Sequence, residues 1–512
     1  MHRMKINQNI SAVIVNDQLL RNEYSVSGSV KRLSSGMKFN DAKDNPSGMA
    51  ISFKMQAQIN ALNRASANAT DGTSMVETID GAMGELTEVI QRIRELCVQG
   101  ANDTNTAEDL KAIQKEIDKL KDEINRVSSD TEYNGRKLLD GSLDRRTYVS
   151  DSATGESMFE DITNVIVSDE VQANKYNVAI QDPPEYAVVG PVTGGTPAGP
   201  GGTVSAAQAG VVYINGARAE IKEGMTEQEV YQTLRDAGDE GWVTIVPTNG
   251  TKHTPPTTDT LKTQGYEEDP AGFTSLSGQM VYVSQKYGSD EKVAIECANP
   301  QLSVLLGLPS TITVTGKDVE VSIDQADLTS TDYNYTGQVV AKTTGDKVVI
   351  TDKSGFEISF QIRASMDVAA TSEIVIDTTD IGTLQLQVGA NQDQELAIRV
   401  PVLNTESMYL DDLDVTKIDG ADRGIAEADV ALSIVSAARS SMGAYENRLD
   451  YIKGGLDATE EDMTNAISRL ADVDMAQEMT EYTNANILTQ ASISVLAQAN
   501  DLPQQVLSLL QG

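Results

Sequence analysis

The sequence predicts a mainly α-helical protein with a β-rich insertion, in which long helices near both chain ends pair into a coiled-coil bundle. Residues 1–140 and 420–512 show helical spacing of apolar residues, whereas residues 180–405 are rich in Gly, Thr, Val and Pro. The two ends are therefore alike and the middle is different. We expect the ends to share one bundle, from which the middle projects as one or more outer domains of α+β or β type.

The first long helix is predicted over residues 51–99 by two interleaved series of apolar or small residues. Members of each series recur every seven positions, and the series are offset by three, as in the a/d seam of a coiled coil. The series are Leu62, Ala69, Val76, Met83, Ile90, Cys97 and Ala65, Gly72, Ile79, Leu86, Ile93, Gly100. At 1.5 Å per residue this helix is about 70 Å long and needs other long helices to bury its stripe.

Two further helical segments supply those partners. One follows a capping box at Thr106–Asp109, and the other lies near the C-terminus with its own seven-residue repeat. The apolar positions are Leu110, Ile113, Ile117, Leu120, Ile124 and Val127 in the first segment, and Val435, Met442, Leu449, Leu456, Met463 and Leu470 in the second. A parallel series in the second runs Ala438, Tyr445, Ile452, Thr459, Ala466 and Val473. The simplest structure packs both segments on the first helix.

The terminal segments carry apolar residues on more than one helical face. One interpretation is that the two terminal helices simply pack on each other. The other is that further copies of the chain cover the remaining apolar surface, so that these segments are assembly elements and are unfolded in the free monomer. The candidate assembly residues are Ile6, Ile10, Val13, Leu20, Ile487, Leu488, Val495, Leu496, Leu507 and Leu510.

We interpret the central zone as small structural units that are either all-β or a mixture of strands and helices. Two short apolar runs around Asn215–Gly216 predict a hairpin over 211–221, and a capping-box start at Thr226 predicts a helix after it. Residues 183–205, rich in Pro and Gly, are interpreted as an exposed linker. Further strands are predicted at 280–284, 293–296, 312–315, 339–341, 347–350, 373–376 and 384–388.

Composition disfavours several classes of function. Acidic residues outnumber basic ones 76 to 40, for a net charge of −36, which argues against nucleic acid and anionic membranes as partners. His2, His253, Cys97 and Cys297 are too few and too far apart for a His-rich metal site, a disulfide framework or a Cys-based zinc site. There is no His-Glu-x-x-His motif, no Gly-rich phosphate loop and no long apolar run. We therefore expect no catalysis, no cofactor, no metal and no membrane insertion.

The first residues lack the apolar core of a secretory signal peptide. The protein is therefore expected to stay in the cytosol or to leave by a route that does not read such a signal.

Several motifs at the two ends resemble those of the bacterial flagellins, the subunits of the flagellar filament. The N-terminal motifs are 4–9 (MKINQN), 33–40 (LSSGMKFN), 42–51 (AKDNPSGMAI), 91–99 (QRIRELCVQ) and 133–139 (YNGRKLL). The C-terminal motifs are 443–449 (GAYENRL), 466–476 (AISRLADVDMA), 494–500 (SVLAQAN) and 506–510 (VLSLL). All of these motifs lie in the two end segments of the chain. The unit at 211–235 is similar to a small module found in flagellins and hook-associated proteins, and Leu302–Leu308 would continue it.

The resemblance implies a division into three domains. Residues 1–45 and 472–512 would form an inner tube of paired helices. Residues 46–175 and 408–471 would form a helical shell with a small β element near 138–175. Residues 176–407 would form the surface-exposed outer part, including a hairpin-helix module near 206–310.

The resemblance also implies a function and a set of partners. The chain would be exported by the flagellar type III apparatus, would polymerise with itself under the filament cap into an extracellular filament for motility, and would join hook-associated proteins. A flagellar export chaperone would mask the C-terminal helix. By matching positions, Arg92, Leu96, Glu116 and Arg448 would contact the flagellin-sensing innate immune receptor, Toll-like receptor 5. The alternatives are a flagellin-like hook–filament junction protein and an adhesin that displays the central insertion on the filament.

Each candidate site also has a plainer interpretation. From the residues alone, Arg92, Leu96, Glu116 and Arg448 form a solvated charged face with one exposed leucine. The loop at 40–48, with Asp41 and Asp44, suggests calcium less than it suggests a turn before a helix that restarts near Pro46. Cys97 occupies a seam position and is interpreted as a small buried apolar residue.

Overall fold

The computed structural model describes residues 9–511 except 153–154, 156, 159–160, 169, 248–275, 277–278, 324–334, 336–338, 354, 364–371 and 380. His253 and Ile6 lie outside the described residues. The chain divides into two compact units. Unit 1 comprises Met1–Ser74, Leu386–Leu396 and Asn447–Gly512, and unit 2 comprises Met75–Gln385 and Ala397–Glu446.

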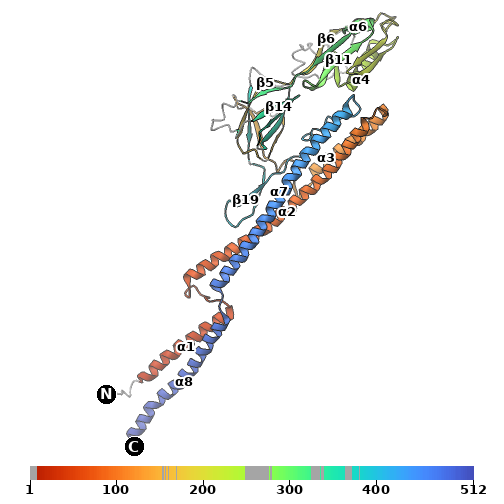
Figure 1. The fold of residues 1–512 in the computed structure, drawn as a ribbon. Coiled ribbons are helices and arrows are strands. Elements are labelled where there is room, and N and C mark those ends of the chain that lie inside the picture. Colours follow the sequence, from red (N-terminus) through yellow and green to blue (C-terminus); the bar gives the residue numbers. More distant parts are fainter. Residues whose placement is uncertain are drawn as a thin grey trace. The chain divides into compact units, whose positions relative to one another are not determined.

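Long helices dominate both ends of the chain, as the heptad series predict (Figure 1). The helices are α1 (Ile10–Ser35), α2 (Pro46–Gly100), α3 (Ala107–Asp130), α4 (Glu227–Glu240), α6 (Pro300–Leu306), α7 (Gly420–Ala471) and α8 (Met475–Gln511). The capping boxes predicted at Thr106 and Thr226 are both formed, each with reciprocal bonds between the cap and the third helical residue. The loop before α2 is a turn, in which the Asn45 side chain accepts a hydrogen bond from the Gly48 N–H at 2.9 Å.

Helices α2 and α7 run antiparallel within each unit, which confirms the predicted pairing of the two chain ends. In unit 1 the hydrogen bonds run from Asn63 to Glu460 (3.1 Å) and from Ser66 to Asp457 (2.8 Å). In unit 2 they run from Arg439 to Asp80 (2.9 Å) and from Arg94 to Asp429 (2.6 Å). Within each unit, residue numbers rise along α2 as they fall along α7.

The seam between these helices is apolar and is best closed in unit 2. Its fully buried side chains there are Val76, Ile79, Met83, Leu86, Ile90, Ile93 and Cys97 from α2 and Val435 and Met442 from α7. A Cβ at Gly424 would lie 2.8 Å from the Cys97 sulfur, so the helices approach closely. In unit 1 the matching α7 positions Leu456, Met463 and Leu470 are only half-buried. The seam therefore opens toward the ends of the chain.

Two β-rich bodies lie in unit 2, and each has its own core. The first is a sandwich of two four-stranded sheets, ordered β13-β5-β17-β3 and β14-β15-β16-β4. Its strands are β3 (Thr147–Asp151), β4 (Ile162–Val167), β5 (Lys175–Asp182), β13 (Glu320–Ser322), β14 (Val340–Thr344), β15 (Lys347–Thr351), β16 (Glu357–Ile362) and β17 (Ser372–Thr378). Phe360 and Tyr176 are its largest fully buried residues.

The second body is a mixed module whose sheets are ordered β12-β11-β7-β8 and β6-β10-β9, with α4 and α6 packed on the same core. Its strands are β6 (Tyr186–Thr193), β7 (Gly210–Ile214), β8 (Ala217–Ile221), β9 (Val243–Pro247), β10 (Gln279–Tyr287), β11 (Lys292–Cys297) and β12 (Thr311–Thr315). The predicted hairpin turns at Asn215 and Gly216, which both have positive φ (49° and 92°). Leu302 belongs to this core, so the residues after 300 do continue the module.

The remaining strands form two small hairpins. They are β1 (Glu132–Tyr133) with β2 (Arg136–Lys137), and β18 (Leu384–Gln387) with β19 (Glu395–Ile398). In unit 1, Leu386 of β18 packs against α2 at Gly72, where an added Cβ would lie 2.5 Å from the leucine Cδ1. The absence of a side chain at this seam position therefore makes room for the hairpin.

Two expectations about the middle of the chain are wrong in part. Residues 183–205 are not simply an exposed linker, because β6 contributes Ala187, Val189 and Val192 to the module core. The predicted domain boundary at residue 175 also differs from the structure, because it would divide one sheet. Strand β3 before this residue and strand β5 after it both pair with β17. The order is nested: the module interrupts the sandwich, and the sandwich interrupts the helical bundle. Alternating apolar residues predicted β7, β8, β10–β12, β14, β15, β17 and β18, but not β5, β6, β9, β13 or β16, nor which strands pair.

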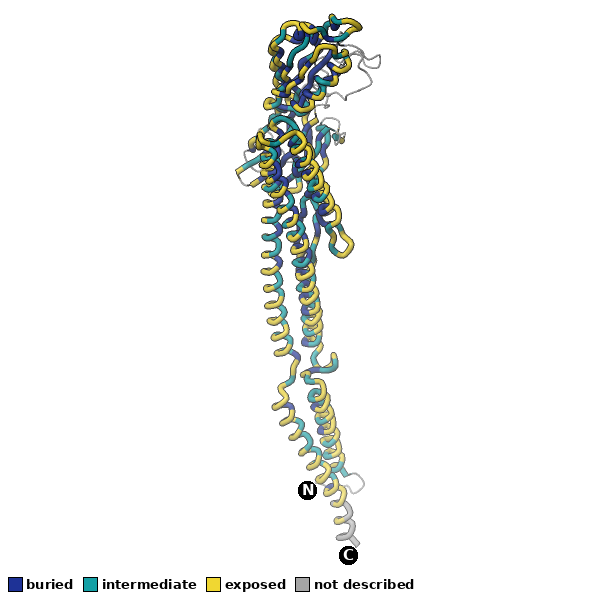
Figure 2. Tube along the Cα trace, turned by 90° about the vertical axis from the view of Figure 1, so that its right-hand side faces the viewer, coloured by how far each residue is buried: buried dark blue, intermediate teal, exposed yellow. Residues whose placement is uncertain are grey.

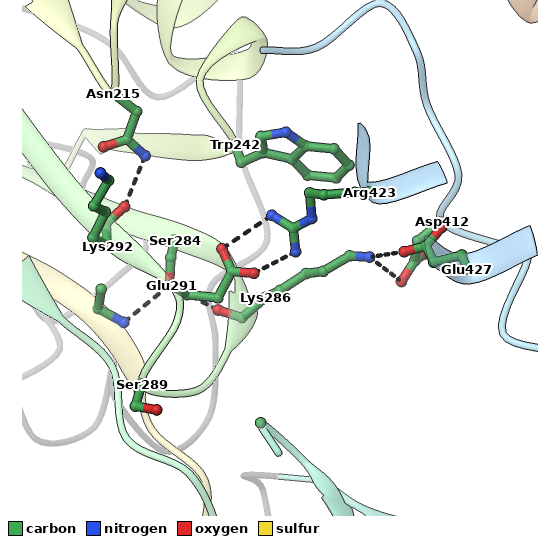
Figure 3. A network of polar contacts seen from close by, with 12 residues as sticks. Asn215, Trp242, Ser284, Lys286, Ser289, Glu291, Lys292, Asp412, Arg423 and Glu427 are labelled. Atoms are coloured by element: carbon green, nitrogen blue, oxygen red, sulfur yellow. Dashed lines mark hydrogen bonds and ion pairs between the residues drawn. The ribbon is translucent and has the colours of Figure 1, made fainter. Parts of the chain in front are cut away.

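The module is joined to the start of α7 by a polar network around Trp242, the only tryptophan of the chain (Figure 3). The indole Nε1 donates to the Ile418 carbonyl at 2.9 Å. Arg423 and Lys417 lie 4.7 and 4.3 Å from the ring centroid, within cation–π range. Arg423 also pairs with Glu291 of the module. The module thus supplies the Glu291 carboxylate and the Trp242 ring, and the segment at the start of α7 supplies the cations Arg423 and Lys417. This complementarity favours one geometry of docking between the module and α7.

We predict that Arg423→Gln loosens this junction by roughly 1 kcal/mol, since it removes one cation–π contact and a partly exposed ion pair. Tryptophan fluorescence should shift to the red and become easier to quench with acrylamide. Arg218→Gln is the control, because the Arg218–Glu220 pair is exposed and lies in the same module. Unchanged quenching in the Arg423 variant would contradict a role for this residue in docking.

Candidate functional site

The candidate site is an exposed apolar surface on α1 and α8, which pack on each other in unit 1. Figure 2 shows how much of both helices is exposed. We call its members the terminal apolar surface: Ile10, Val13, Ile14, Leu20, Tyr24 and Val30 on α1, and Met475, Met479, Ile487, Leu488, Ile493 and Val495 on α8. Ile10 and Val13 are 61% and 67% exposed.

Local sequence signals set the ends of both helices. The Asn9 side chain caps the start of α1, and Gly36 ends it in the left-handed conformation (φ 73°). The Asp474 carboxylate accepts hydrogen bonds from the first backbone N–H groups of α8. Between the helices and the α2–α7 pair, the chain segments at Met37 and Asp472 form an antiparallel bridge. Helix formation here is locally specified, while burial of the apolar residues is not.

Exposed large apolar side chains are concentrated in unit 1. Among the described residues, 16 of the 23 that are exposed belong to unit 1, although this unit is much the smaller. Isolated exposed apolar residues are ordinary on protein surfaces, but a dense group of them marks an interaction surface. At about 25 cal/mol per Å², burying one such Leu or Ile fully is worth roughly 1.5–3 kcal/mol. In the single chain these side chains stay exposed, so this stabilisation is not obtained.

The face between α1 and α8 is, in contrast, partly polar. Asn22, Ser29 and Glu478 are buried there. The Glu478 carboxylate accepts a hydrogen bond from the Arg32 guanidinium at 2.7 Å, which lowers the pKa of Glu478. The same bond raises the pKa of Arg32. The sequence analysis did not single out these residues. Asn22 and Ser29 are seven positions apart, so they follow the same seven-residue repeat as the apolar seam residues, but with polar side chains.

Six of the ten predicted assembly residues are exposed in the single chain. Ile10, Val13, Leu20, Ile487, Leu488 and Val495 are exposed. Leu496 is half-buried and faces α1 rather than solvent. Leu507 and Leu510 lie in α8, but their side chains, like Ile6, are outside the described residues.

The predicted receptor-contact residues are only partly brought together. In unit 2, Arg92 donates to Glu116 at 2.7 Å and pairs with Glu95 at 3.2 Å, and all three side chains are exposed. Leu96 is 1% exposed, so the expectation of an exposed leucine beside Arg92 is wrong. The heptad frame placed Leu96 outside the seam of α2, but its side chain is buried all the same. Arg448 is exposed on the part of α7 that belongs to unit 1.

The described residues offer little for chemistry. No group of three or more His, Cys, Asp or Glu side chains among them is arranged to hold a metal ion. Nor does any helix in the described part of the chain have the length and apolar character needed to cross a membrane. Cys97 and Cys297 are both free and buried, and burial raises the pKa of the Cys97 thiol to about 11. Cys97 is therefore a packing residue, as its seam position predicts.

Comparison with known proteins gives consistent matches at both ends. The family model of the bacterial flagellin N-terminal helical region matches residues 6–144, and that of the C-terminal helical region matches residues 425–510. The flagellin of Salmonella rubislaw is 30% identical over 540 residues and covers 99% of each chain. The flagellin of Clostridium tyrobutyricum is 30% identical over 508 residues, covering 98% of this chain and 100% of its own.

Among solved structures, FliC from Burkholderia pseudomallei is 16% identical, with 74% of this chain and 99% of that chain covered and a TM-score of 0.22.

We predict that acid weakens the α1–α8 contact through Glu478. Because its folded-state pKa is lowered, the carboxylate stabilises the pair at neutral pH, and this contribution is lost as the pH falls below the usual glutamate range near 4.3. Hydrogen exchange of α1 amides is followed from pH 7 to pH 3 and divided by the intrinsic exchange rate at each pH. The resulting protection should fall more in the native protein than in Glu478→Gln, and an equal fall in both proteins would contradict the prediction.

Proposed function

The chain belongs to the bacterial flagellin family, the structural subunits of flagellar filaments, and we propose that its terminal apolar surface is the contact through which copies polymerise. The observation that carries the proposal is the concentration of exposed apolar side chains on α1 and α8. Filament growth needs a contact between identical subunits that does not close on itself, and long parallel rods offer such lateral surfaces repeatedly. As a structural subunit of an extracellular filament, the chain works by assembly.

Ordering on assembly follows from the same surface. A pair of helices with a half-polar interface and apolar outer faces gains little by forming alone, because ordering its backbone costs about 1–2 kcal/mol per residue. Neighbouring copies supply the missing burial. We therefore propose that residues 1–45 and 472–512 become ordered as the inner tube, that the α2–α3–α7 bundle forms the shell, and that the β-rich bodies face outward.

The proposal extends to partners met before and during assembly. An exported subunit would carry its apolar C-terminal helix through the cytosol, where a flagellar export chaperone on α8 would prevent premature contacts. Passage through the flagellar type III apparatus in unfolded form is compatible with two free cysteines and no disulfide to form. The filament cap and the hook-associated proteins would meet the same terminal helices at the growing and basal ends.

We predict that Ile487→Ser with Leu488→Ser abolishes elongation of native filament seeds while leaving the subunit folded. The two side chains are 58% and 55% exposed, so their removal costs the monomer little. In the filament each lost burial is worth roughly 1.5–3 kcal/mol. Elongation is measured by light scattering and electron microscopy, and folding by circular dichroism.

The control is Val304→Ser, which changes an apolar residue of α6 that is 73% exposed but lies outside the terminal helices. It should elongate seeds at the native rate. Normal elongation by the double variant would remove the terminal apolar surface as the polymerisation contact.

We also propose that the chain is a ligand of Toll-like receptor 5, through the charged cluster of Arg92, Glu95 and Glu116 and through Arg448. An exposed arginine held by a carboxylate presents a fixed donor fork, which suits a contact hot spot. Leu96 lies four residues after Arg92 on the same helix and does not reach solvent, so we assign it a supporting role.

We predict that Arg92→Ala raises the concentration of monomer needed for half-maximal receptor signalling by at least about tenfold, the effect of a hot spot worth roughly 1.4 kcal/mol. The measurement is a receptor reporter assay with purified monomer. Lys119→Ala is the matched control, because Lys119 is an exposed cation on α3 that pairs only locally with Asp122. Equal potency of both variants would count against the assigned contact.

A further inference from the structure

We propose that the polar residues buried between α1 and α8 set the axial register of the two helices and so align the two halves of the terminal apolar surface. The inference rests on the proposed function, because it concerns how the assembly surface is built. It assigns a positioning role to Asn22, Ser492, Arg32 and Glu478. None of these residues belongs to the terminal apolar surface itself.

The contact face of each helix follows a heptad seam. On α1 most buried and half-buried positions step by three and four residues: Ala12, Val15, Leu19, Asn22, Val26, Ser29 and Leu33. Half-buried Gly28 and Arg32 lie directly beside this series. On α8 they step by four and three, with half-buried Asn486 beside the series: Glu478, Tyr482, Ala485, Thr489, Ser492, Leu496 and Ala499. The helices run antiparallel, since Asn9 contacts Ala499 and Arg32 contacts Glu478. This is a short coiled coil whose seam contains polar groups.

An apolar heptad seam alone does not fix register, because a slip of seven residues brings apolar residues together again. A polar residue at a seam position penalises such a slip when its partner is lost. The buried Asn22 side chain donates to the Ser492 hydroxyl at 3.1 Å. A slip of α8 by one heptad in either direction would place Ala485 or Ala499 opposite Asn22 and leave its amide without that acceptor.

The second polar pair behaves in the same way. Arg32 donates to Glu478 at 2.7 Å, and the Glu478 residue is only 5% exposed. After a one-heptad slip the position of Glu478 would be taken by Ala485 or by Ala471, which lies before α8 begins. Burying a carboxylate without its partner is strongly unfavourable. By contrast, the bond from Asn9 to the Ala499 backbone carbonyl carries no register information, because every residue has a carbonyl.

Register matters because the terminal apolar surface is divided between the two helices. A slip of seven residues would move the apolar residues of α8 by about 10 Å along those of α1, at 1.5 Å per residue. Copies packing on both helices at once would then meet a displaced pattern. The polar seam therefore selects the one alignment that neighbouring subunits can cover.

The first test is a charge exchange measured by elongation of native seeds. Arg32→Glu and Glu478→Arg should each slow elongation at least tenfold, and the two together should restore the rate to within about threefold of native. Arg21→Glu is the control and should elongate normally, because Arg21 on the same helix pairs only with Asp17 at the surface. Native rates in both single variants, or no recovery in the double variant, would overturn the inference.

The second test separates register from mere stability. Replacing Asn22 and Ser492 together by Leu removes one of the two polar pairs from the seam, so hydrogen exchange of α1 in the assembled protein should be unchanged or slower. Elongation should nevertheless fall at least threefold, since only the Arg32–Glu478 pair then penalises slipped alignments. Native elongation by this variant would overturn the role assigned to Asn22 and Ser492. Normal elongation by the Ile487→Ser, Leu488→Ser variant would instead count against the proposed polymerisation surface.

Discussion

The antiparallel contact of α2 with α7 is the constraint on which the rest of this protein depends. It joins segments that lie more than three hundred residues apart, through an apolar seam that is fully closed around Met83, Ile90 and Met442. The entropic cost of closing so long a loop grows only slowly with its length. The folded bodies between the two helices bring the chain back to its starting point, and in sequence one β-rich body is nested inside the other.

The burial of the seam residues differs between the two units. We relate the buried part to folding of the single chain and the less buried part to the proposed assembly. In unit 2 most seam residues of both helices are fully buried, so this part is nearly complete within one chain. In unit 1 the α7 seam is half-buried beyond Leu449, and many apolar residues of α1 and α8 are exposed. One sequence pattern, the heptad, thus gives a closed intramolecular core in unit 2 and a contact that leaves many apolar side chains exposed in unit 1.

The sequence predicts much of the helical part and less of the rest, for physical reasons. Helix periodicity and capping are local, so α2, α3 and α7 follow from heptads and from Thr106. Some strands, such as β10 and β15, follow from alternation, whereas β5 and β16 do not. Pairing such as that of β17 with both β3 and β5 is set by contacts far apart in sequence. Leu96 illustrates the same limit within the site, because the heptad frame places it outside the seam whereas its side chain is buried.

Nesting has a consequence for how such chains diversify. The strands that flank the module are neighbours: Asp182 at the end of β5 faces Glu320 at the start of β13 in the same sheet. The polypeptide therefore leaves the sandwich and re-enters it at almost one point, so the module is an insertion between two paired strands of the same sheet. Everything between these two residues can be exchanged, lengthened or lost without breaking a ladder of the host sheets. The length and surface of the module can thus change at this insertion point while the helices at the two ends of the chain keep their sequence.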